Sequence, residues 1–254
     1  MTDDIDPILD SWDSLGSGRR ITGADGREKI QLRVEANGHR GLVQFNCDGR
    51  PDGKRPHGCD FALEHYVARF ERHVASSAPP EAFRLSHEEA AELIAEAVLV
   101  YNRYVLLLQL EDYERVIRDT ERNMRLFRFL HRHAEQPDDA NALEKWWPYI
   151  IRIHQTARAS AAADKKDFEA ALAAAKEAER EIIALPDLDD PVFKIERERS
   201  VQAISEMEEV FGKRVPPDRV ALLEDEKLRA IEREDYEHAA RLRDEIKRMR
   251  GQEG

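Results

Sequence analysis

The chain has 254 residues, which is enough for one large domain or two modest ones. Charged residues make up 36% and apolar residues 41%, a balance that suits a folded helical protein better than a disordered one. The formal net charge of −12, from 40 basic and 52 acidic residues, argues against indiscriminate binding to nucleic acid.

The sequence suggests neither export nor membrane insertion. Its first ten residues, MTDDIDPILD, are acidic where a secretory signal has a basic region. The most apolar stretch, residues 97–110, is interrupted by Asn102 and Arg103 and is too short to cross a bilayer. Two cysteines provide no disulfide framework. We therefore expect a cytoplasmic protein, in the simplest case a bacterial one.

Residues 1–18 form an acidic N-terminal segment. Four apolar residues in it are spaced as on one face of a short helix: Ile5, Ile8, Leu9 and Trp12. This spacing predicts a short helix that docks on the rest of the chain. A frayed terminus with one anchored turn fits the same residues, because chain ends are often poorly ordered.

Residues 19–75 are predicted to form a small α+β domain with a β-hairpin. Apolar and polar residues alternate in IQLRVE and roughly again in GLVQFNC, which is the period of a half-buried strand. Asn37-Gly38 lies between these runs and is a strong turn signal, so the runs are expected to pair through a slightly long loop. After a loop rich in Gly and Pro, residues 61–74 have the spacing of a helix.

Residues 84–214 are predicted to form a helical-repeat domain that resembles tetratricopeptide organisation. Ser86 followed by Glu89 is a capping box, so a helix is expected to begin there. EDYERV at Glu111 and KDFEAA at Lys166 are predicted to open equivalent helices 55 residues apart. This period is longer than the usual repeat of about 34 residues.

Two prolines predict helix boundaries in the same region. Pro148 is expected to kink or split the helix that opens near Asn141. Asp190-Pro191 predicts the start of a further charged helix, with Asp as the N-cap and Pro in the first position. This helix is expected to run to about Phe211.

The loop GRPDGKRP contains three basic residues that could hold a phosphate: Arg50, Lys54 and Arg55. Glycine amides beside basic side chains can bind an anion. The spacing is not that of a P-loop, since no Ser or Thr follows Lys54. A structural turn, in which Asp48 and Asp52 pair with the arginines, explains the same residues and is favoured.

Other chemistry-bearing residues do not form a recognisable site. His39, Cys47, His57 and Cys59 lack the paired CxxC or HxxxH spacing of zinc loops. No Ser-His-Asp, Cys-His or HExxH arrangement has a usable spacing. We therefore expect no metal site, no cofactor and no enzymatic activity.

Residues 218–250 are predicted to form an antiparallel pair of amphipathic helices that turn at Glu234-Asp235. Apolar residues recur at helical spacing in both runs, with charged residues between them. A lone pair of helices leaves part of its apolar surface in water, so it needs a second surface from its own chain or from a partner. The residues expected to bind that partner are Leu223, Leu228, Ile231, Tyr236, Ala239, Ala240, Arg243 and Ile246.

The segment LRAIEREDYEHAARLRDEIKRM resembles the UVR domain shared by the excision-repair proteins UvrB and UvrC. The most specific part is aromatic-Glu-x-Ala-Ala-x-x-Arg-Asp-x-Ile, which begins at Tyr236. In that family the hairpin is a protein-docking element that often meets another copy of itself, and relatives occur in regulators of bacterial protein quality control. The upstream β-hairpin and GRPDG-type loop resemble uncharacterised bacterial proteins with a UVR motif, which implies a shared architecture and no activity.

Arg243 is the residue of this hairpin with the sharpest expectation. It follows Tyr236 by seven residues, nearly two turns, so it is expected on the same face as Tyr236 and Ala239. A charge inside an apolar stripe is costly unless it is paired, and the resemblance implies an Arg-Asp pair at this position. We expect either a bidentate contact to an acidic residue, within the hairpin or across an interface, or a guanidinium that reaches solvent at the stripe's edge.

Together these patterns predict a mainly α protein with a small α+β N-terminal domain, a helical-repeat middle and a C-terminal UVR hairpin. The expected function is that of a non-catalytic adaptor, linked to nucleotide excision repair, that binds a protein partner through the hairpin. That partner is either another UVR-containing protein or a second copy of the chain. One alternative is a DNA-repair accessory that contacts nucleic acid through the basic N-terminal loop. Another is a regulator of a kinase or protease in protein quality control.

Overall fold

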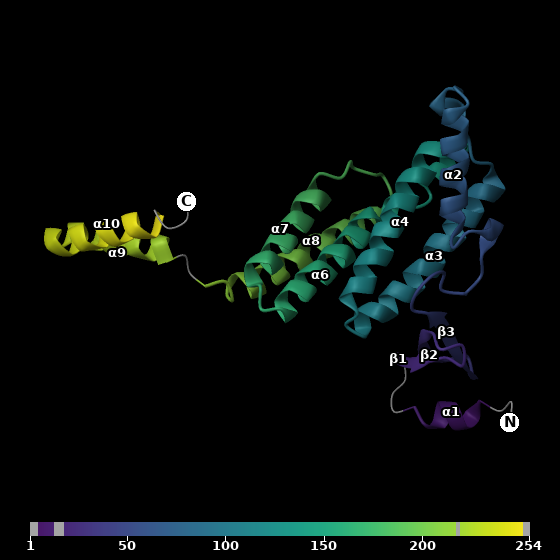
Figure 1. The fold of residues 1–254 in the computed structure, drawn as a ribbon, viewed down its shortest axis with the longest axis horizontal. Coiled ribbons are helices and arrows are strands. Elements are labelled where there is room, and N and C mark those ends of the chain that lie inside the picture. Colours follow the sequence, from purple (N-terminus) through teal and green to yellow (C-terminus); the bar gives the residue numbers. More distant parts are fainter. Residues whose placement is uncertain (1–4, 13–17, 217–218, 251–254) are drawn as a thin grey trace. The chain divides into compact units, whose positions relative to one another are not determined.

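The computed structural model describes residues 5–12, 18–216 and 219–250 (Figure 1). The chain divides into two compact units, Met1–Glu209 and Val210–Gly254, and each is described by itself. Helices dominate both units, and a small antiparallel sheet lies in the N-terminal part of the first. The predicted mainly α fold, with a small N-terminal sheet and a helical hairpin at the C-terminal end, is confirmed.

The sheet has the strand order β1-β2-β3, with β2 (Glu28–Ala36) paired to β3 (His39–Asn46) as the predicted hairpin. The connection is tighter than the slightly long loop that the sequence predicts. Ala36 pairs directly with His39, so only Asn37 and Gly38 form the turn. Both have positive φ, 52° and 78°, as a two-residue hairpin turn of type I′ requires.

The strand β1 (Gly18–Thr22) is a part of the sheet that the sequence pattern does not predict. Its sequence, GRRIT, contains two arginines and lacks the alternation that marks β2 and β3. Its conformation depends on pairing with β2, from Gly18 opposite Leu32 to Thr22 opposite Glu28. An edge strand of this kind is determined by its neighbour and not by its own pattern.

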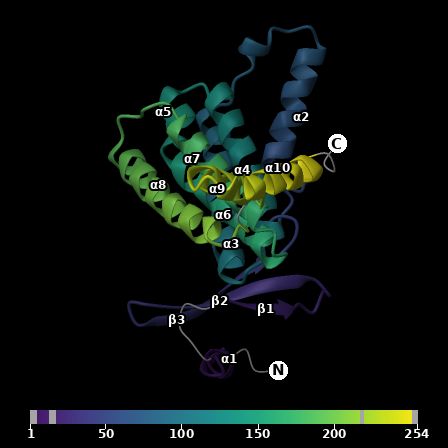
Figure 2. The same cartoon turned by 90° about the vertical axis from the view of Figure 1, so that its left-hand side faces the viewer.

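The docking helix predicted in the acidic N-terminal segment is present as α1 (Asp6–Asp10). Leu9 and Trp12 are buried, whereas Ile5 and Ile8 are exposed. Arg33 of β2 donates from Nη1 to the carbonyl oxygen of Leu9 at 2.7 Å. Figure 2 shows the sheet between α1 on one side and the helices of this unit on the other.

The first long helices are α2 (Ala62–Ala75) and α3 (His87–Gln109). The predicted capping box opens α3, because the Glu89 amide donates to Ser86 Oγ at 3.4 Å and the Ser86 amide donates to Glu89 Oε2 at 3.0 Å. Each of these contacts satisfies a backbone amide that the first turn of a helix leaves without a partner.

Five further helices complete the first unit and the start of the second: α4 (Tyr113–His133), α5 (Pro137–Asn141), α6 (Trp147–Asp164), α7 (Phe168–Ile183) and α8 (Pro191–Gly212). Successive long helices pack on one another from α3 through α4 and α6 to α7 (Figure 1). Pro148 lies in the first turn of α6, so the predicted split occurs and the proline begins a helix. Asp190 Oδ1 accepts from the Val192 amide at 2.7 Å, which confirms the predicted N-cap of α8.

One turn recurs at three helix junctions, including the junction of α9 (Arg219–Glu232) and α10 (Tyr236–Arg250). Before α4, α7 and α10 an Asp N-cap follows a residue with φ of 56° to 62°, in turn Glu111, Lys166 and Glu234. At the first junction the Asp112 amide donates to Leu107 O at 2.9 Å and the Glu111 amide to Leu108 O at 3.1 Å. These bonds satisfy the last carbonyls of the preceding helix. The equivalence predicted from EDYERV and KDFEAA is therefore present in the backbone.

Segments 19–75 and 84–214 share a hydrophobic core in the first unit. Phe61 and Cys47 pack in one cluster with Val100 and Tyr104 of α3, so the sheet and the loop after it rest on the helices. Nearly all residues from 19 to 214 belong to the first unit, Met1–Glu209. Residues 218–250 lie in the second unit. None of the helices that the structure describes combines the length and the apolar character of a membrane span.

Candidate functional site

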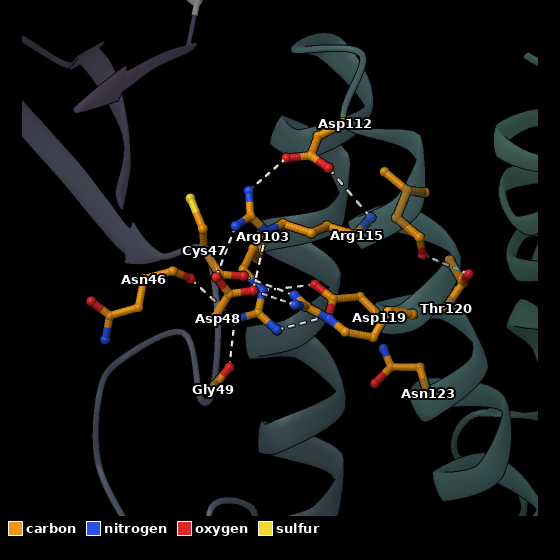
Figure 3. Close-up of polar contacts among 12 residues, drawn as sticks. Asn46, Cys47, Asp48, Gly49, Arg103, Asp112, Arg115, Asp119, Thr120 and Asn123 are labelled. Carbon is orange, nitrogen blue, oxygen red and sulfur yellow. Dashed lines mark hydrogen bonds and ion pairs between the residues drawn. The ribbon is translucent and has the colours of Figure 1, made fainter. Parts of the chain in front are cut away.

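The loop that follows β3 is held by a buried arginine of α3, as Figure 3 shows. Arg103 donates from Nε to Asp119 Oδ2 at 2.7 Å and from Nη2 to Asp119 Oδ1 at 2.8 Å, and both residues are buried. Its remaining nitrogen, Nη1, donates to the carbonyl oxygens of Asn46 (3.1 Å) and Gly49 (2.6 Å). The guanidinium therefore connects α3, α4 and the loop at one point.

Asp48 lies in the same loop and faces two arginines of α4. Arg115 donates from Nη2 to Asp48 Oδ2 at 2.8 Å (Figure 3). Arg118 donates from Nη1 to Asp48 Oδ1 at 2.6 Å. The hydrogen bonds from Arg115 hold the pKa of Asp48 below its usual value. The sequence predicted that Asp48 would pair with arginines of its own loop; its partners come instead from the facing helix.

The predicted phosphate residues are not brought together. Arg50 donates from Nε to Asp52 Oδ1 at 2.9 Å and also pairs with the buried carboxylate of Glu96, so its side chain points into the protein. Arg55 is exposed and pairs with Asp60 at 3.2 Å. Lys54 is exposed on the loop. This geometry favours the structural turn over a phosphate site.

Glu96 explains why Arg50 is needed inside the protein. One oxygen of this α3 carboxylate accepts from the Ala62 amide at 2.7 Å and the other from the Leu63 amide at 3.1 Å, at the first turn of α2. The carboxylate thus caps a helix from outside it. A buried carboxylate also requires a cation, and Arg50 supplies one.

The residues considered for a metal site have other surroundings. Cys47 is buried, and burial raises the pKa of its thiol. His57 lies 3.0 Å from Glu92 Oε2 through Nε2 and stacks on the ring of His65. Over the described ranges, no three His, Cys, Asp or Glu residues are grouped so that they could hold a metal ion.

The second candidate site is the hairpin of α9 and α10, whose inner surface is made of small and branched residues: Ala230, Ala239, Leu242 and Ile246. Leu223 and Ala240 are half-buried beside them. Leu242 was missing from the residues predicted to contribute, although it follows Ala239 by three positions and precedes Ile246 by four. That spacing was a usable signal.

Three residues predicted to share this stripe point outward instead. Leu228 is 56% exposed, Ile231 44% and Tyr236 67%, and Leu222, which was not predicted, is 53% exposed. The reason is the helical period: at about 100° per residue, Leu228 lies roughly 140° around α9 from Leu223. A single face cannot contain both residues. The hairpin therefore has a buried seam and, in addition, apolar side chains exposed to solvent.

Arg243 also lies outside the buried seam, and its side chain is 68% exposed. It donates from Nε (3.0 Å) and Nη2 (2.8 Å) to a single oxygen, Oδ1, of the adjacent Asp244. It shares the exposed side of α10 with Tyr236, as predicted, but not the buried side with Ala239. The pairing with an acidic residue is therefore found within the hairpin, but it is not bidentate, because one carboxylate oxygen accepts both bonds, and the guanidinium also reaches solvent.

One polar contact between the two helices, from His238 of α10 to Glu226 of α9, was not predicted from the sequence. His238 lies 3.1 Å from Glu226 Oε1 through Nε2, and its backbone amide donates to Asp235 Oδ1 at 3.1 Å. The imidazole thus joins α10 to α9 next to the turn. The residues are twelve positions apart, so only the folded hairpin brings them together.

Comparison with protein families gives one match, and it falls on this hairpin. The matching family model is described as the UvrB/uvrC motif and covers residues 218–252, which contain α9 and α10. Comparison with curated proteins and with solved structures gives no match. The C-terminal hairpin, with its buried seam and exposed apolar side chains, is the part of this chain that is similar to the UvrB/uvrC motif.

Proposed function

We propose that this protein is a non-catalytic adaptor that binds a protein partner through the hairpin of α9 and α10. The observation that carries the proposal is the outward position of four large side chains on this small element: Leu222, Leu228, Ile231 and Tyr236. Protein interaction is also a known role of the motif that residues 218–252 match.

The energetics support a docking role. Full burial of a large apolar side chain is worth about 1.5–3 kcal/mol, and these four are only 44–67% exposed, so covering them supplies roughly 3–6 kcal/mol before the costs of association. Their present exposure contributes nothing to the stability of the hairpin. A partner with an apolar helical surface would remove them from water, and Arg243 beside Tyr236 would meet an acidic residue at the rim.

The proposal extends to the cellular pathway in which the adaptor acts. Proteins with this motif act in nucleotide excision repair, and relatives regulate protein quality control. We place this adaptor in the repair setting, with quality control as the alternative. The identity of the captured partner, a repair protein or a kinase or protease, distinguishes the two.

Removing residues 218–254 is expected to abolish partner capture and to leave the main melting transition nearly unchanged. The reason is that Met1–Glu209 has its own core clusters. Affinity capture with the full-length and the truncated chain, followed by thermal melting of both, measures the two effects. A large fall in the main melting temperature after truncation would show that the hairpin stabilises its own chain, contrary to the proposal.

A double variant, Leu228→Ala with Tyr236→Ala, tests the exposed surface without removing the hairpin. We expect its affinity for the captured partner to fall at least about tenfold, because two large apolar contacts are lost. Ile183→Ala is the matched control, since Ile183 is similarly exposed but lies on α7. Equal binding by the double variant and the control would contradict the proposed surface.

A further inference from the structure

The outer face of the sheet, on the side of α1, carries one arginine from each strand (Figure 2). Directly paired residues of neighbouring strands share a face, and so do alternate residues of one strand. Arg19 of β1 lies opposite Gln31 of β2, and Arg40 of β3 lies opposite Glu35 of β2. Arg33 lies between Gln31 and Glu35 at the same alternation. The face is therefore basic, in a chain whose net charge is −12.

Charge directs the N-terminal segment to this face. Residues 1–18 contain five aspartates and neither lysine nor arginine. Two of these aspartates, Asp10 and Asp6, pair with Arg40 at 2.5 and 3.4 Å. The three side chains are exposed to solvent, so each ion pair is screened by salt and contributes little by itself. The pairs favour an acidic segment without holding it firmly.

Two apolar side chains anchor the segment. Leu9 and Trp12 are buried, and Arg33 donates from Nη1 to both of their carbonyl oxygens, at 2.7 and 3.4 Å. The guanidinium of Arg19 lies 4.1 Å from the centroid of the Trp12 ring, which is the geometry of a cation–π contact. The arginines thus contact carboxylates, backbone carbonyls and an aromatic ring. A segment of another chain with the same groups can make the same contacts.

The helix α1 is a small occupant of this face. Its five residues span about 8 Å, whereas the nine residues of β2 span about 30 Å. Ile5 and Ile8 remain exposed, so α1 leaves half of its own apolar side chains in water. A helix this short is not stable in isolation. We therefore expect α1 to leave the face far more readily than the core helices open.

We propose that the outer face of the sheet is a docking site for an acidic amphipathic helix of a protein partner, and that α1 occupies this site in cis as a competitor. The partner's helix carries carboxylates for Arg40 and apolar or aromatic anchors in the places of Leu9 and Trp12. A longer helix covers more of the face than α1 and displaces it through that difference in affinity. The sheet belongs to the first unit, so this site is separate from the hairpin and does not rest on the function proposed above.

The site is tested with a labelled, capped peptide, IDPILDSW, which repeats residues 5–12. In the full-length chain, Leu9→Ser combined with Trp12→Ser removes the anchors of α1 and leaves the face unchanged. We expect this released variant to bind the peptide at least about tenfold more tightly than the wild type, because α1 then occupies the face less than about a tenth as effectively. Fluorescence anisotropy measures both affinities. Equal affinities, or no binding to either protein, would overturn the proposal.

The chemistry of the partner is tested in the same released variant. Arg40→Glu is expected to weaken peptide binding at least about tenfold, because it turns two attractions into repulsions, whereas Arg180→Glu on α7 is not. Replacing both aspartates of the peptide by asparagine is expected to weaken it about fivefold. Equal binding of the two peptides would overturn the role of charge. An oligothymidylate that binds more tightly than the peptide would identify a nucleic-acid surface and overturn the proposed protein partner.

Hydrogen exchange of the wild type tests the displacement without any variant. The amides of Leu9 and Trp12 donate to carbonyl oxygens within the segment. They are expected to exchange at least about a hundredfold faster than the amide of the buried Leu126 in α4, because the opening of α1 requires no opening of the core. Protection of the α1 amides equal to that of Leu126 would show that α1 is an integral part of the fold and would overturn its role as a competitor.

Discussion

Replacing Arg103 by Met is expected to lower the free energy of unfolding by about 3–5 kcal/mol. The substitution removes two hydrogen bonds, at 2.7 and 2.8 Å, from the buried carboxylate of Asp119, which then keeps only the contact of Arg118 at 3.0 Å. It also leaves the carbonyl oxygens of Asn46 and Gly49 without the Nη1 donor. Urea unfolding followed by circular dichroism measures the loss.

Two further variants separate the causes. Arg103→Met combined with Asp119→Leu is expected to recover much of the loss, because the buried carboxylate that has lost its buried partner is then gone. The remaining difference from the wild type measures how much the loop carbonyls contribute. Arg180→Met is the exposed control: Arg180 pairs with Glu177 at the surface, and a change within about 1 kcal/mol is expected. A loss that small for Arg103→Met would show that the buried pair does not hold the loop.

Acidification from pH 7 to pH 4 is expected to cost on the order of 3 kcal/mol of stability through His154 alone. Burial, with a smaller contribution from the charge of Arg158, lowers the pKa of His154 to about 4, whereas an unfolded histidine has a pKa near 6.5. Between these values the unfolded chain binds more protons than the folded one. The free energy of unfolding therefore falls as the pH falls through this window.

The measurement compares urea unfolding of the wild type and of His154→Gln at several pH values between 7 and 4. The glutamine variant is expected to lose less stability on acidification than the wild type, because the group that must bury a charge is absent. Thr120 Oγ1 lies 2.9 Å from His154 Nδ1, and glutamine retains a polar atom for that hydroxyl. Other acid-sensitive pairs contribute equally to both curves, so the difference isolates His154. Parallel curves would show that His154 titrates normally in the folded protein.

Local signals in the sequence were sufficient for much of the helical structure. The Ser86–Glu89 capping box, the Asp190 N-cap and Pro148 at the start of α6 each depend on atoms a few residues apart. The Asn37-Gly38 turn is of the same kind. Such features form in nearly the same way whatever surrounds them, and this is why the pattern predicts them.

Contacts across the fold were not predictable in this way. Arg50 appeared in the sequence as a basic residue of a glycine-rich loop, but its partner Glu96 is 46 positions away on α3. Arg103 appeared as an interruption of an apolar stretch, and the structure makes it the centre of a buried network. Asn123 of α4 lines a pocket together with residues of α3, α6 and α8. A linear pattern contains no information on which distant group supplies the partner.

By itself the sequence determined the mainly α character of this protein, the hairpin of strands, the equivalent starts of α4 and α7, and the C-terminal motif. Each of these depends on periodicity or on hydrogen bonds within one or two turns of chain. Only the tertiary structure decided that Arg50 faces inward, that β1 joins the sheet, and that Leu228 and Tyr236 remain exposed while Leu242 is buried. The physical reason is that burial and charge pairing depend on which surfaces meet in space, and residues that share an apolar character can lie on opposite sides of one helix.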